Sequence, residues 1–84
     1  MLSNLLANDL ADKRFYGIYR GIVADINDPE NANRIKVQIP QLLGSAVTGW
    51  SYPIISTSPG NPGTGVWVMF EGGDPNFPLW LGAF

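Results

Sequence analysis

Two pairs of acidic side chains lie close together in the sequence at predicted turns, Asp25 with Asp28 and Glu71 with Asp74. A pair of carboxylates can provide a general acid and a general base. Both pairs fall at predicted turns, however, where aspartate usually accepts hydrogen bonds from the neighbouring backbone. The chain has no histidine or cysteine, and a nucleophilic serine would need a lysine as its base. We therefore predict no catalytic residue and do not expect an enzyme.

The segment Glu71–Pro75, which reads EGGDP, has the glycine and the acidic residues of a calcium-binding loop. Calcium takes about six or more oxygen ligands, and the one or two carboxylates of this segment fall short of that number. Zinc is disfavoured because histidine and cysteine, its two strongest ligands, are absent. The sequence thus predicts no metal site and no cofactor.

Basic and aromatic side chains are the other residues with binding potential. Single-stranded nucleic acid is held by a cationic groove and by rings on which bases stack. The formal net charge of −2 argues against such a partner, so this function is an alternative that requires cations and rings to line one groove. The residues concerned are the cations Lys13, Arg14, Arg20, Arg34 and Lys36 and the rings of Tyr16, Tyr19, Trp50, Tyr52 and Trp67.

The small size of the chain limits the core that can position these residues. Its 84 residues form one domain at most, and without cysteine no disulfide can compensate for a marginal core. Charged residues make up 14% of the sequence, below the roughly 25% that is usual for soluble domains. This composition fits either a β-rich fold or a surface that a partner covers. No run approaches the ~20 apolar residues of a membrane span, and the N-terminus lacks the basic region of a signal peptide.

Most of the chain is predicted to form short β-strands. The clearest strand is Arg34–Pro40, where Ile35, Val37 and Ile39 are expected to face the core. The polar side chains of the same strand, Arg34, Lys36 and Gln38, are expected to face outward. The other predicted strands are Phe15–Ile26, Trp50–Ile55, Val66–Glu71 and Leu79–Phe84.

Two turns are expected to fix how these strands pair. Proline presets φ at the second position of a turn, and the aspartate before it can bond its own backbone. Glycine allows the positive φ that a tight hairpin needs. The residues to which we assign this structural role are Asp28, Pro29, Arg34, Gly72, Gly73, Asp74 and Pro75.

Contacts with partners are expected at two other places. Leucines recur at helical spacing in residues 1–14, which favours a short amphipathic helix or arm before the domain. Residues 56–65 contain no apolar side chain besides prolines and are predicted to form an exposed loop. The candidate contact residues are Leu2, Leu5, Leu6 and Leu10 of the arm and Pro59, Asn61 and Pro62 of the loop.

Together these elements predict an all-β fold, a small five-stranded OB-fold barrel over residues 15–84. A closed barrel leaves few exposed strand edges, which suits a chain without helices to cover them. An SH3-like barrel has a similar strand count and size and is the second choice.

The order of the motifs resembles one family. The stretch FYGIYRGIVADINDPENANRIKVQIPQLLG is followed by TGWSYPI, a loop rich in proline and glycine, and GVWVMFEGGDPNFPLWLG. From about Phe15 to Gly82, this order is similar to the N-terminal OB-fold domain of phage baseplate central spike proteins and of the related spike proteins of type VI secretion. An Asp-Pro turn alone is common, but the motifs are specific in this order and spacing.

The resemblance implies a structural role. In that family the domain belongs to a homotrimeric hub or spike of a contractile injection machine, where it helps join the end of the tail tube to the needle. The implied partners are other copies of the chain, tail-tube or hub proteins, and a spike or needle protein. The implied location is a virion tail baseplate or the tip of an injection particle. The chain has no room for the lysozyme or needle domain of longer relatives, so we expect a minimal adaptor or part of a longer spike.

Overall fold

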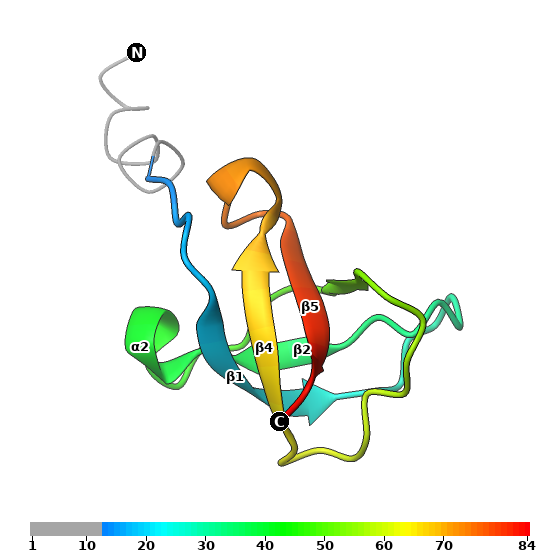
Figure 1. Ribbon diagram of the computed structural model, residues 1–84. Helices are drawn as coiled ribbons and strands as arrows, with labels where there is room; N and C mark the ends of the chain where they lie inside the picture. Colours follow the sequence, from blue (N-terminus) through cyan, green and yellow to red (C-terminus); the bar gives the residue numbers. More distant parts are fainter. Residues whose placement is uncertain (1–12) are drawn as a thin grey trace.

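The computed structural model describes residues 13–84, which are built mainly of strands (Figure 1). A short helix follows the second strand, and a 3-10 turn joins the last two strands. The elements are β1 (Tyr19–Asp25), β2 (Lys36–Gln38), α2 (Pro40–Leu43), β3 (Tyr52–Pro53), β4 (Gly65–Phe70), η1 (Glu71–Gly73) and β5 (Pro78–Ala83).

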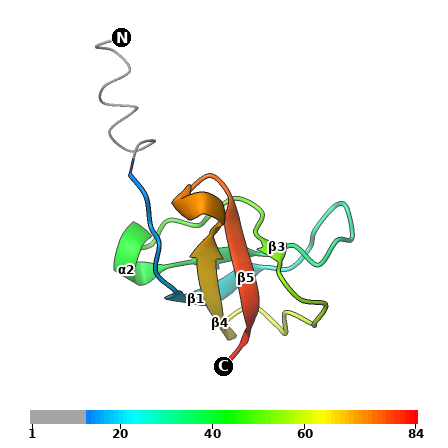
Figure 2. The same ribbon diagram turned by 45° about the horizontal axis from the view of Figure 1, so that its top comes forward.

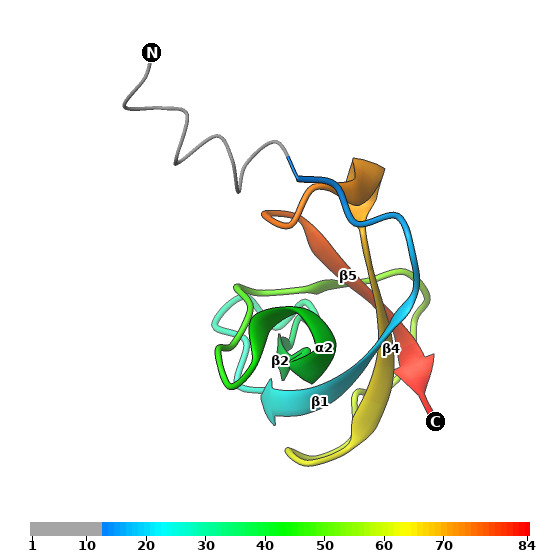
Figure 3. The same cartoon turned by 90° about the vertical axis from the view of Figure 1, so that its left-hand side faces the viewer.

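The strands form one curled sheet in the order β2-β1-β4-β5-β3. Neighbouring strands are antiparallel except β3 and β5, which run parallel and lie side by side in Figure 2. The two ends of this order meet at Ile35 and Ser51, which exchange backbone hydrogen bonds of 3.1 and 2.7 Å. Figure 3 shows the resulting bend of the sheet from β2 through β1 to β4 and β5. The predicted all-β fold of OB type is confirmed.

The core is filled by the inward-facing residues of alternating strand positions. Ile35, Val37 and Ile39 are fully buried, as predicted. Trp80 is also fully buried, and its indole N–H donates a hydrogen bond of 3.0 Å to the Asn33 carbonyl. That bond satisfies the polar edge of a large aromatic side chain in the core. The remaining core residues are Val23, Val66, Val68 and Phe70.

Three strands are shorter than predicted, for local reasons. The first begins at Tyr19 rather than Phe15, because the Phe15 N–H bonds the Gly73 carbonyl at 2.9 Å and the chain then bends at Gly17. The second ends before Pro40, which instead begins α2, a position that proline favours. The third is only Tyr52–Pro53, since proline has no N–H to extend the ladder.

The predicted N-terminal helix falls outside the described residues, and with it the contact candidates Leu2, Leu5, Leu6 and Leu10. The part of the arm that is described, Lys13 and Arg14, is exposed. Within residues 13–84, no helix is long and apolar enough to span a membrane.

Candidate interaction surface

Asp28 organises the turn between β1 and β2. Its carboxylate accepts hydrogen bonds from three backbone N–H groups of that turn, at 2.9, 2.9 and 3.1 Å. It also receives the guanidinium of Arg34, with Nη2 at 2.7 Å from Oδ1 and Nε at 3.0 Å from Oδ2. Pro29 follows at the exposed tip of the turn. One carboxylate therefore joins both ends of the connection to β2.

The prediction that Arg34 faces outward is wrong. The residue is only 9% exposed, because its guanidinium turns back onto Asp28 instead of extending into solvent. The hydrogen bonds from Arg34 hold the pKa of Asp28 well below its ordinary value and raise the pKa of Arg34. The pair is charged at all ordinary pH values.

The aromatic residues of the third strand region gather around this pair. The Arg34 guanidinium carbon lies 5.6 Å from the centre of the Trp50 ring and 5.4 Å from that of Tyr52. The Lys36 ammonium lies 5.0 Å from the Trp50 ring. Two carboxylates offset the charge of Arg34. Its Nη2 lies 2.7 Å from Oδ1 of Asp28 and 3.6 Å from Oε1 of the exposed Glu30.

Arg20 lies in a different aromatic group, 5.6 Å from the Trp67 ring and 5.8 Å from the Phe84 ring. Neither ring belongs to the group around Trp50. Among residues 13–84, the ring contacts of Arg20 therefore belong to a different group from those of Arg34 and Lys36. This division does not favour the nucleic-acid alternative, which needs both along one path.

The second predicted turn contains η1 and the residues up to β5. Gly72 and Gly73 have φ of 59° and 75°, which side-chain-bearing residues rarely adopt. The Asp74 carboxylate accepts a hydrogen bond of 2.9 Å from the Asn76 N–H, and Pro75 lies between them. This turn sets the pairing of β4 with β5, in which Phe70 lies opposite Pro78.

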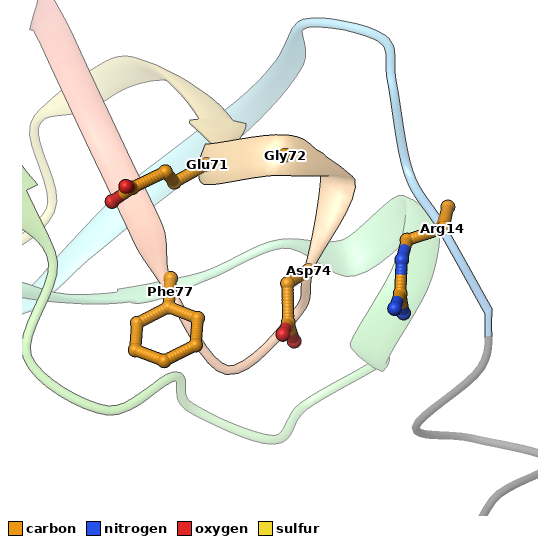
Figure 4. Close-up of a pocket in the computed structure, with 5 residues that line it drawn as sticks. All are labelled: Arg14, Glu71, Gly72, Asp74 and Phe77. Carbon is orange, nitrogen blue, oxygen red and sulfur yellow. The ribbon is translucent and has the colours of Figure 1, made fainter.

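A shallow hollow lies beside η1 (Figure 4) and is lined by Arg14, Glu71, Gly72, Asp74 and Phe77. In Figure 4 the Glu71 side chain extends to the side opposite Arg14, so its carboxylate does not converge with that of Asp74. Within residues 13–84, no group of three or more acidic residues could hold a metal ion. The hollow therefore lacks the paired carboxylates that acid–base catalysis would use.

The loop predicted to contact partners is anchored at its C-terminal end. The Gly63 N–H bonds the Val23 carbonyl and the Val23 N–H bonds the Thr64 carbonyl, each at 2.8 Å. Asn61 and Pro62 are exposed at the tip, while Pro59 is half-buried. The loop thus presents a defined, solvent-exposed edge next to β1.

The comparison with known families agrees with this architecture. Residues 19–84 match the family described as type VI secretion system/phage-baseplate injector OB domain. The chain belongs to this family. The match begins at the first residue of β1 and includes every strand of the barrel, so the resemblance seen in the motifs is confirmed. No curated protein matches the sequence significantly.

Membership gives the coarse function. Injector OB domains are structural parts of baseplates and spikes, so this chain is a structural domain of a phage or secretion particle. Two of the motifs on which the resemblance rests, Asp28-Pro29 and Asp74-Pro75, lie in the turns described above.

This injector OB domain also has an apolar surface that the sequence reasoning missed. We define the outer sheet face as Arg20 of β1, Trp67 of β4 and Leu81 of β5, together with Ile18 just before β1 and Phe84 just after β5. A hollow there is lined by three of these residues, Ile18, Trp67 and Leu81. Trp67 packs against Phe84 with ring centres 4.8 Å apart.

A signal for the outer sheet face is present in the sequence. Val66–Phe70 and Pro78–Leu81 are apolar at every position. A strand with one solvent-exposed face instead alternates apolar and polar residues. An uninterrupted apolar run therefore indicates that both faces of β4 and β5 are meant to be covered. The alternation in residues 34–40 identifies core residues only, so it gives no information about this outer surface.

Proposed function

We propose that the chain is a homotrimeric connector in a contractile injection machine, and that it joins the end of the tail tube to the central spike. The observation that carries this proposal is the family match, which covers the whole barrel from β1 to β5. The location that follows is the virion tail baseplate or the tip of a secretion particle. No catalytic residue and no cofactor is needed for such a role.

The architecture suits a part that transmits load between partners. The Asp28–Arg34 pair fixes one turn, η1 fixes another, and the Ile35–Ser51 hydrogen bonds close the sheet. The central strands β1, β4 and β5 are bonded on both sides, and the Ile35–Ser51 bridge joins the two ends of the sheet, so shearing of one strand past another would break several hydrogen bonds at once. The anchored loop with Pro59, Asn61 and Pro62 is the described surface that we assign to neighbouring subunits.

The location can be tested on particles purified from the source organism. A short epitope tag fused to the chain and visualised by gold-labelled antibody should lie at the spike end of the tube. Deletion of the gene should yield tubes without an attached spike. Labelling along the tube or sheath, or spikes still attached after deletion, would contradict a connector role.

A further inference from the structure

We propose that the leucine-rich N-terminal segment, residues 1–12, docks onto the outer sheet face of its own chain. The proposal does not depend on the connector function, since it concerns a contact within one molecule. It assigns Leu2, Leu5, Leu6 and Leu10 to that contact and leaves the loop with Pro59, Asn61 and Pro62 for partners.

The outer sheet face has the character of a covered surface. Ile18 and Phe84 are 58% and 62% exposed among residues 13–84, although both are large apolar side chains. With Trp67 and Leu81 they form a continuous apolar area around the hollow on β1, β4 and β5. Contiguous apolar areas on a small domain mark sites that another segment occupies.

The N-terminal segment has the length and the tether to reach this face. Phe15 is held at Gly73, just beyond the end of β4, and residues 13 and 14 alone separate it from the segment. As a helix, twelve residues would be about 18 Å long. That length matches β4, whose six residues extend about 20 Å. The segment can therefore fold back and lie along the strand.

Charge complementarity selects this segment as the occupant. Arg20 is the charged residue of the outer sheet face, and among residues 13–84 no carboxylate forms an ion pair with it. In the segment, Asp9 follows Leu5 by four residues and Leu6 by three, so helical spacing places it on the leucine side. A leucine stripe with one acid thus meets an apolar sheet with one cation.

The contact can be tested in the full chain by paramagnetic relaxation. The sequence contains no cysteine, so Asn4→Cys provides a single site for a spin label. Helical spacing places position 4 off the leucine side, because it is one residue from Leu5 and two from Leu6. We expect stronger loss of amide signal at Ile18 and Leu81 than in α2, which lies away from β5 in Figure 1.

The charge pair gives the decisive variants. In the labelled chain, Arg20→Asp should reduce the signal loss at Leu81, and the double change with Asp9→Arg should restore it. Lys36→Gln, which alters a cation of the other aromatic group, should have no effect. Equal loss in α2 and at Leu81, or no rescue by the charge exchange, would overturn the proposal. Loss that appears only when the label is on a second, mixed chain would assign the face to another copy and would also overturn it.

Discussion

Asp28 holds the β1–β2 turn from several directions at once, because backbone donors and the Arg34 guanidinium share its two oxygens. The Arg34 side chain in turn lies against the rings of Trp50 and Tyr52. A substitution of Asp28 should therefore alter the packing of both the turn and the neighbouring aromatic group.

Asp28→Asn should lower the urea midpoint of unfolding at pH 7, because the buried Arg34 would lose its charged partner. The pH dependence follows from the depressed pKa of Asp28 in the folded chain. The pair stabilises the fold above the ordinary aspartate pKa of 3.8, and that stabilisation is lost as the pH falls below it. The difference between wild type and Asp28→Asn should thus be large at pH 7 and shrink toward pH 2.

Glu30→Gln is the matched control for Asp28→Asn. Glu30 approaches the same guanidinium, but at 3.6 Å and with a side chain that is 66% exposed. Solvent weakens such a pair, so the urea midpoint should change little. Equal effects of the two substitutions, or a pH-independent effect of Asp28→Asn, would show that the ion pair does not stabilise the turn.

Gly73→Ala should destabilise the chain by about 1–2 kcal/mol, the typical cost of a left-handed conformation with a Cβ atom. Gly73 has a φ of 75°, and an added Cβ would lie 2.7 Å from Cε1 of Tyr16, which must move aside. Gly49→Ala is the control, because its Cβ would meet open space and its φ lies outside the positive range. Urea unfolding should show no loss for Gly49→Ala, and an equal loss in both variants would contradict the assigned role of η1.

At the scale of strands and turns, the sequence predicted those features that depend on local pattern. The alternation from Arg34 to Pro40 identified the inward residues of β2, and Asp-Pro and Gly-Gly identified the turns. The burial of Arg34 could not be predicted from alternation, because it depends on a carboxylate brought back by the turn. The length of β3 depends in the same way on its pairing with β5, a strand far along the chain.

The site was less predictable than the fold. The outer sheet face combines Ile18, just before β1, with Trp67 of β4 and Leu81 of β5, so it exists only once the sheet has formed. The sequence offers both Trp50 and Trp67 as stacking residues, but the fold places them in different aromatic groups. Spacing along the chain carries little information about such grouping.

Gly21→Ala tests the close crossing of strands at the centre of the sheet. A Cβ at Gly21 would lie 2.8 Å from Cγ2 of Val68 and 3.2 Å from the Gln38 carbonyl oxygen. Because backbone cannot move aside easily, we expect a loss of about 1–3 kcal/mol in the free energy of unfolding. Ala24→Val, at an exposed position of the same strand, should be nearly neutral in urea unfolding. A neutral Gly21→Ala would mean that β1 and β4 are less closely packed than described.

At the scale of the whole molecule, the small barrel combines fixed turns with an apolar outer sheet face and an exposed, anchored loop. The family match places such a barrel among injector domains that are parts of larger particles. In our account the N-terminal segment covers the sheet, while the loop and adjoining surface meet other subunits. We propose that the trimer forms through surface that the chain's own arm leaves open.

The measurement that tests this account most directly is the mass of the full chain by light scattering after gel filtration, over a series of protein concentrations. We predict a species of three times the chain mass that persists on dilution, because the connector that we propose is a homotrimer. A well-folded monomer at every concentration would contradict the proposal that this domain trimerises through its own surface.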